Sequence, residues 1–121
     1  MKITDIKTFI VDAGWRPWMF VKVETDEGIY GWGECSDGKL PNGIDGVIRD
    51  LKPVLIGKDP RAFEMRFTEM LINTRQSRWG VAAKALAGLD CAFIDIKAKA
   101  LGISVAELFG GPTRYKVRVY W

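Results

Sequence analysis

The hydrophobic and polar positions between residues 81 and 111 follow a helical period more clearly than any other part of the chain. Apolar side chains recur there at three- and four-residue spacing and form one face: Ala82, Ala85, Leu86, Leu89, Phe93, Ile96 and Ala100. Much of the remaining surface is small, so that other backbones can approach closely: Ala83, Ala87, Gly88 and Ala92. The pattern predicts a buried helix over residues 81–100.

The residues after this helix predict a stop and then a second, shorter helix. Gly102 suits a left-handed C-cap, and Lys97 and Lys99 place positive charge near the helix C-terminus. Ser104 and Glu107 have the S-x-x-E spacing of a capping box, which opens a short helix. We therefore expect a long helix, a tight turn and a short helix in succession.

The first 35 residues alternate between apolar and polar side chains, which is typical of β-strands. The alternation predicts three strands, over Met1–Asp12, Trp18–Thr25 and Ile29–Cys35, with a hairpin turn between the second and the third. In the third strand Gly31 and Gly33 leave one face almost bare. We expect a helix or a loop to pack closely against that face.

Two more helices and one more strand are expected. A helix is predicted over Ile44–Lys52, where Pro53 ends or disturbs it. The next helix is predicted to begin with Asp59 as its N-cap and Pro60 at its first position. Alternation over Arg114–Trp121 predicts a final strand. Three antiparallel strands followed by helices indicate an α+β fold with the helices on one face of the sheet.

The composition is that of a folded domain, and it narrows the possible chemistry. Hydrophobic residues make up 48% of the 121 positions, and the net charge of +3 includes no basic cluster. The net charge alone argues neither for nor against nucleic acid. Tyr30, Trp32 and Phe20 could form a base-stacking surface, but without clustered Lys or Arg a core or interface role is favoured, so no nucleic-acid partner is expected. No continuous apolar segment marks a signal peptide or a membrane span, so a cytoplasmic protein without membrane contact is expected. Histidine is absent, which removes the commonest general base and transition-metal ligand.

The segment LDCAFIDIKAKALGISVAELFGG, residues 89–111, resembles the end of the N-terminal domain in the enolase superfamily, within its mandelate racemase and muconate lactonizing branch. The matching positions are Asp90, Ala92, Asp95, Lys99, Leu108, Gly110 and Gly111. The pair Ile103-Ser104 departs from the family pattern, which commonly has proline at the second position. The stretch MFVKVETDEGIYGWGECS and the loop WRPW are most similar to galactonate-dehydratase-like members.

This resemblance implies a three-stranded antiparallel meander followed by three helices, as in the enolase N-terminal domain. It divides the chain into a capping domain, residues 1–112, and the start of a C-terminal (β/α)₈ barrel, residues 113–121. It further implies a homo-oligomeric, Mg²⁺-dependent dehydratase or racemase that removes the proton α to the carboxylate of an acid sugar. The family's bases and metal ligands lie on later barrel strands. No catalytic residue and no metal ligand is therefore expected here, and the chain alone should be inactive.

The resemblance implies substrate contact from the loop between the first two strands and from the loop after the third. Arg16 can make a bidentate contact with a small carboxylate substrate, and Lys39 can add a point charge. Trp15 and Trp18 can form walls of the same pocket. The alternative is that the tryptophans pack against the sheet and the charges are solvated.

Other candidate sites have simpler structural interpretations. Asp90 and Asp95 are five residues apart and do not share a helix face, so ion pairing or capping is favoured over a metal site. Cys91 is expected to be a small core residue and not a reactive thiol. The alternative function that the sequence leaves open is a stand-alone, non-enzymatic module for oligomerisation or interaction.

Overall fold

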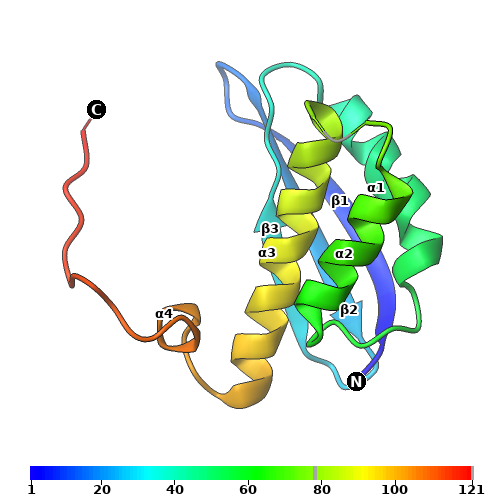
Figure 1. The fold of residues 1–121 in the computed structure, drawn as a ribbon. Helices are drawn as coiled ribbons and strands as arrows, with labels where there is room; N and C mark the ends of the chain where they lie inside the picture. The colour runs from blue at the N-terminus through cyan, green and yellow to red at the C-terminus, as the bar shows by residue number, and fades with distance from the viewer. Residues whose placement is uncertain (78, 121) are drawn as a thin grey trace.

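The computed structural model describes residues 1–77 and 79–120, which form one antiparallel sheet and four helices. The strands are β1 (Ile3–Asp12), β2 (Pro17–Thr25) and β3 (Tyr30–Glu34), in the spatial order β1-β2-β3. The helices are α1 (Pro41–Leu55), α2 (Phe63–Asn73), α3 (Val81–Leu101) and α4 (Val105–Leu108). Figure 1 shows α1, α2 and α3 on one side of the sheet, which confirms the predicted α+β fold.

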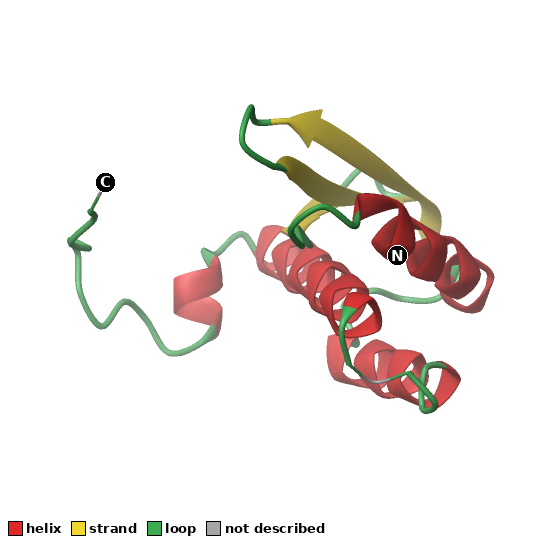
Figure 2. Cartoon of the chain, turned by 90° about the horizontal axis from the view of Figure 1, so that it is seen from above, coloured by secondary structure: helices red, strands yellow, loops and turns green. Residues whose placement is uncertain are grey.

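The core lies between the sheet and helices α1 and α3, and α2 packs on the side of these two helices that faces away from the sheet (Figure 2). Met19, Val21 and Val23 alternate along β2 and are buried against the helices. From α3, Leu89 and Phe93 fill the same layer and are fully buried. The arrangement follows from a strand period of two residues meeting a helix period of 3.6.

Helix α3 lies very close to β3. The two elements meet through backbone atoms, because Gly31 and Gly33 have no side chains to separate them. A Cβ atom added to Gly31 would lie 2.0 Å from the carbonyl oxygen of Ala92. One added to Gly33 would lie 1.9 Å from the carbonyl oxygen of Gly88. The expectation that another element packs closely against the bare face of this strand is therefore confirmed.

The outer edge of β3 is partly covered by two charged side chains of α3. Asp95 accepts a hydrogen bond of 3.0 Å from the backbone N–H of Trp32, and Lys99 donates one of 2.9 Å to the carbonyl of Tyr30. The two side chains also pair with each other at 2.7 Å. An exposed strand edge offers unpaired backbone groups to other chains, so this pair protects the edge as well as holding the helix. The structural role expected for Asp95 is confirmed.

The predicted boundaries of the first helix are too narrow. Helix α1 begins at Pro41 and continues through Pro53 to Leu55. Proline is costly in a helix interior because it removes one hydrogen bond and crowds the preceding turn. Here it falls in the last turn, and the burial of Leu51 and Leu55 stabilises the helix beyond it.

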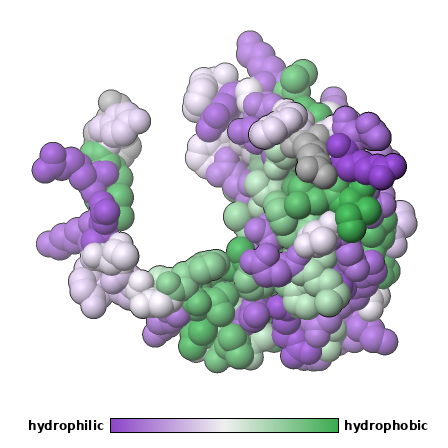
Figure 3. Space-filling model, in the orientation of Figure 1, coloured by the Kyte–Doolittle hydropathy of each residue, from purple (hydrophilic) through white to green (hydrophobic). Residues whose placement is uncertain are grey.

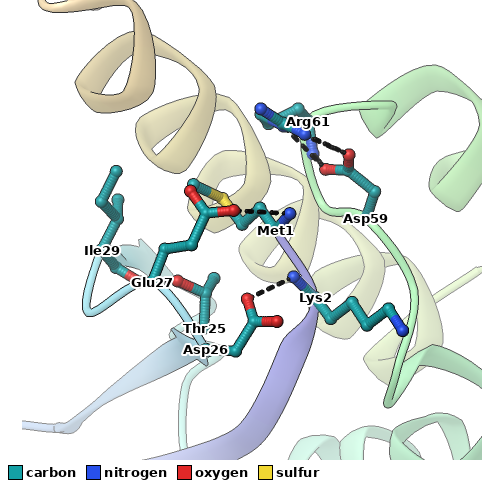
Figure 4. Close-up of polar contacts among 8 residues, drawn as sticks. All are labelled: Met1, Lys2, Thr25, Asp26, Glu27, Ile29, Asp59 and Arg61. Carbon is teal, nitrogen blue, oxygen red and sulfur yellow. Dashed lines mark hydrogen bonds and ion pairs between the residues drawn. The ribbon is translucent and has the colours of Figure 1, made fainter.

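The predicted start of the second helix at Asp59 and Pro60 is wrong. Helix α2 begins at Phe63, after Ala62 in the N-cap position. The Asp59 carboxylate accepts hydrogen bonds from the backbone N–H of Arg61 at 2.9 Å and from its guanidinium at 2.7 Å (Figure 4). This local turn uses the acceptor that would otherwise have capped a helix.

Figure 4 also shows how the N-terminus is attached to the turn between β2 and β3. The α-amino group of Met1 pairs with the carboxylate of Glu27 at 2.7 Å. The backbone N–H of Lys2 donates to the carboxylate of Asp26 at 2.7 Å. These contacts fix the start of β1 against the neighbouring strands.

The chain beyond α3 forms the predicted turn and short helix but not the predicted strand over Arg114–Trp121. Gly102 is left-handed, with a φ of 68°, and Ser104 and Glu107 form the capping box of α4. Residues 114–120 contain no strand, and residue 121 lies outside the described part of the chain. A strand requires a hydrogen-bonded neighbour. The segment instead runs apart from the sheet and helices (Figures 1 and 2).

Candidate functional site

Two loops lie together at one end of the sheet, the loop between β1 and β2 and the loop between β3 and α1 (Figure 1). They line a hollow of about 410 Å³ whose walls are Ile10, Asp12, Gly14, Trp15, Arg16, Pro17 and Lys39. This volume is within the usual range for small-molecule sites. The fold therefore brings together three of the four residues selected from the sequence, namely Trp15, Arg16 and Lys39.

The β1–β2 loop is a short turn at the tip of the hairpin. Asp12 and Pro17 form the last residue pair of the two strands. The Asp12 carboxylate accepts a hydrogen bond of 2.8 Å from the N–H of Gly14, whose φ of 85° is one that residues with a Cβ rarely adopt. Trp15 and Arg16 follow directly, so the turn places both side chains at the end of the sheet.

The second loop is attached to β2 at its start. The N–H of Met19 donates a hydrogen bond of 3.0 Å to the hydroxyl of Ser36. Further along, the N–H of Leu40 closes a turn on the carbonyl of Asp37 at 3.1 Å. Lys39 lies in this turn, exposed to solvent, and forms one wall of the hollow.

The hollow carries more positive than negative charge. The guanidinium of Arg16 lies 4.3 Å from the centre of the Trp15 ring, a cation–π contact that keeps it at the hollow's edge. Its Nε atom is buried and has no hydrogen-bond acceptor among the described residues. Lys39 adds a second cation, whereas Asp12 is the one carboxylate in the lining and already accepts from Gly14. This arrangement suits an anion with paired oxygen atoms, such as a carboxylate.

Trp18 does not line the hollow. It lies on the outer face of the sheet, 38% exposed, with its ring 6.1 Å from that of Phe20. Sequence reasoning in turn missed Ile10, because alternation along β1 puts it on the same face as the buried Ile6 and so favours a core position. The hairpin extends beyond the helical layer, so Ile10 is 48% exposed and forms a wall of the hollow.

The residues that the structure describes do not fit a Mg²⁺ ion. Across residues 1–77 and 79–120, no three His, Cys, Asp or Glu side chains lie close enough to hold a metal. Magnesium requires several oxygen ligands in octahedral geometry, and the hollow offers the single carboxylate of Asp12. Among the same residues, no helix is long and apolar enough to cross a membrane.

Comparison with known proteins shows which family this architecture represents. The sequence profile of the mandelate racemase / muconate lactonizing enzyme N-terminal domain matches residues 5–110. The chain belongs to this family. The resemblance identified in residues 89–111 is thereby confirmed, and the fold described above is that of the family's N-terminal domain.

Curated relatives of this N-terminal domain include two D-galactonate dehydratases. The one from Variovorax paradoxus is 39% identical over 120 residues, which are 99% of this chain and 31% of the relative. The one from Pectobacterium atrosepticum is 40% identical over 121 residues, again 99% of this chain and 31% of the relative. The chain therefore spans 31% of the length of these relatives.

Solved structures of the enolase superfamily match the same fold. An enolase from Agrobacterium radiobacter, bound to sodium and L-malate, has a TM-score of 0.92 and 30% identity, covering 99% of this chain and 30% of its own. An enolase from Pantoea ananatis with bound D-gluconate and magnesium has a TM-score of 0.87 and 36% identity, with coverage of 93% and 28%. The 3,6-anhydro-D-galactonate cycloisomerase of Zobellia galactanivorans has a TM-score of 0.85 and 32% identity, covering 92% and 32%.

Proposed function

We propose that residues 1–112 form the substrate-capping domain of a Mg²⁺-dependent acid-sugar dehydratase or racemase of the mandelate racemase / muconate lactonizing type. Residues 113–121 then begin the (β/α)₈ barrel that completes the active site. The reaction is removal of the proton α to the substrate carboxylate. The parent enzyme is expected to be a cytoplasmic homo-oligomer.

The observation that carries this proposal is the positive hollow formed by Arg16 and Lys39 beside Trp15. An arginine over an aromatic ring keeps its fork of N–H donors in a fixed orientation, which matches the two oxygens of a carboxylate. The solved relatives bound to L-malate and to D-gluconate carry small hydroxy acids, which have the same chemistry. The stand-alone interaction module is not favoured, since the curated relatives are dehydratases.

In this proposal the chain contributes binding and closure, and the barrel contributes the chemistry. Arg16 and Lys39 hold the anionic substrate, while the indole of Trp15 and the side chain of Ile10 limit the access of water. Mg²⁺, when bound by barrel carboxylates, stabilises the negative charge that develops on the substrate. None of its ligands comes from the residues that line the hollow.

The test compares Arg16→Ala, Arg16→Lys and the unchanged protein, each including the barrel, on a panel of sugar acids. A charge-assisted, bidentate hydrogen bond contributes about 1.5–3 kcal/mol, so Arg16→Ala should lower kcat/KM by roughly 10- to 100-fold. Arg16→Lys keeps the charge but loses the fork, and should give an intermediate value.

The matched control is Arg49→Ala. Arg49 is an exposed arginine of α1 that pairs with Asp45 at 2.8 Å and does not line the hollow. The Arg49→Ala substitution should therefore leave kcat/KM unchanged. The 121-residue chain assayed alone should show no turnover of any sugar acid. Unaltered kinetics of Arg16→Ala across the panel, or turnover by the chain alone, would contradict the proposal.

A further inference from the structure

The lining of the hollow is rich in charged groups and poor in neutral groups that bind hydroxyls. Arg16 and Lys39 supply two positive charges and Asp12 supplies one negative charge, so the described lining has a net charge of +1. No serine, threonine, asparagine or glutamine belongs to that described lining. Figure 3 shows mainly hydrophilic and pale surface at this end of the molecule, whereas hydrophobic surface gathers over the helices. The hollow thus complements one carboxylate better than it complements the hydroxyls of a sugar chain.

The two cations of the lining are not neutralised by the chain itself. The Asp12 carboxylate accepts a hydrogen bond of 2.8 Å from the N–H of Gly14 and so stabilises the turn before Arg16. Among the described residues, no ion pair involves Arg16 or Lys39. The Nε atom of Arg16 is also buried without an acceptor in that part of the chain. Because a buried donor without an acceptor costs free energy, the guanidinium calls for an anion from outside the chain.

The reaction in the proposed function, on which this inference rests, needs a separate place for the carboxylate next to the reacting carbon. When the proton α to a carboxylate is removed, negative charge develops on the oxygens of that same carboxylate, so these oxygens must lie at the metal. The described residues around the hollow cannot hold a metal, because Asp12 is their single carboxylate. The reacting carboxylate therefore binds outside the hollow, and the anion held by Arg16 and Lys39 is a second one.

We propose that the parent enzyme acts on sugar acids with a carboxylate at both ends, and that Arg16 and Lys39 bind the carboxylate farther from the reacting carbon. A sugar acid with one carboxylate ends in a neutral hydroxymethyl group, which would leave both cations without an anion. A site built for a charged group rejects an analogue that lacks this group, because the polar groups of the site are then left unpaired. The hollow thus selects diacids over mono-acids.

Matched pairs of substrates isolate the second carboxylate. Galactarate and D-galactonate share their hydroxyl configuration and differ at C6, which is a carboxylate in the first and a hydroxymethyl group in the second. D-Glucarate and D-gluconate form a second such pair. For the protein that includes the barrel, kcat/KM for a diacid should exceed that for its mono-acid by roughly 10- to 100-fold. Calorimetric titration of the metal-free protein should also show the diacids binding more tightly, by roughly 10-fold, because Arg16 and Lys39 need no metal to hold a carboxylate.

Two variants assign this preference to the hollow. Arg16→Gln removes the charge but keeps a donor for a hydroxyl, so it should lower kcat/KM for the diacid by roughly 10- to 100-fold and leave the mono-acid unchanged. Lys39→Gln should reduce the preference by a smaller factor, because Lys39 is an exposed point charge. The control Arg49→Ala should leave both members of each pair unchanged, since Arg49 does not line the hollow.

The possible results separate this inference from the proposed function. A mono-acid that binds and reacts as well as its matched diacid would overturn the preference for diacids. An Arg16→Gln variant that loses the same factor on both members of a pair would overturn it too; Arg16 would then hold the carboxylate that both share, and the proposed function would stand. If Arg16→Gln changes neither member, both proposals fail. A protein that turns over no sugar acid would contradict the proposed function, while the calorimetric comparison would still decide the preference of the hollow.

Discussion

The close approach of α3 to β3 can be tested by adding a single methyl group. In Gly33→Ala the new Cβ would lie 1.9 Å from the carbonyl oxygen of Gly88 and 2.7 Å from its carbonyl carbon. Both are backbone atoms, so no side-chain rotation can relieve the clash. Helix α3 has to move away from the sheet, which separates buried contacts of Leu89 and Phe93 as well.

The expected loss is large compared with the stability of a small domain. Overpacking a core costs typically 1–3 kcal/mol, and a clash between two backbones should reach the upper end, about 3 kcal/mol or more. Domains of this size are stable by about 5–15 kcal/mol. A loss of 3 kcal/mol should lower Tm by roughly 10 °C.

Urea denaturation followed by tryptophan fluorescence and circular dichroism measures this loss. The matched control is Gly46→Ala in the exposed middle of α1, where a new Cβ would meet no atom within 4 Å. It should stabilise the chain by about 0.5–1 kcal/mol, because alanine is the better helix former. A Gly33→Ala protein as stable as the parent would show that the backbones of α3 and β3 are not in contact.

Two further predictions concern ionisable groups. Hydrogen bonding from the Arg61 side chain lowers the pKa of Asp59 to about 2 from 3.8, so its ionised form stabilises the fold above pH 4 and this contribution is lost as pH falls toward 2. An NMR titration should place the Asp59 midpoint near 2, and Arg61→Ala should return it toward its ordinary value; a midpoint near 4 in the parent would refute this. Burial raises the pKa of both thiols, that of Cys35 to about 11, but Cys35 is buried whereas Cys91 is exposed. A disulfide reagent at pH 8 should therefore modify Cys91 in the native protein and Cys35 only after unfolding, and equal rates for the two thiols would contradict the burial of Cys35.

The parts of the fold that sequence reasoning predicted well are those where several local signals agree. Helix α3 combines a long apolar period with a glycine C-cap at Gly102 and the capping box of Ser104. The bare face of β3 at Gly31 and Gly33 indicated close packing before any partner was known. In each case short-range pattern and tertiary contact favour the same structure.

The errors arise where a partner far along the sequence decides the outcome. Pro53 does not end α1 because buried contacts outweigh a local breaker in the last turn. Residues 114–120 alternate like a strand but have no neighbouring strand among the described residues. Cys91 was expected in the core and is exposed, because the packing of α3 against β3 and α2 determines which of its faces is buried. Cys35, at the end of β3, is buried instead.

The candidate site could be predicted in part. Arg16 and Lys39 were selected from two loops that the resemblance places together, and both line the hollow. Trp18 was selected as well. It directly precedes the buried Met19 in β2, and alternating side chains along a strand put Trp18 on the opposite, outer face of the sheet. Ile10 could not be identified, since its exposure depends on how far the hairpin extends beyond the helices.

The central claim is that the hollow at the end of the sheet holds the carboxylate of an acid-sugar substrate. A crystal structure of the protein that includes the barrel, with a sugar acid bound, tests it most directly. We predict that a carboxylate oxygen of the ligand lies within about 3.2 Å of the Arg16 guanidinium, with Lys39 also facing the ligand. A ligand bound with Arg16 and Lys39 both turned to solvent would contradict the claim.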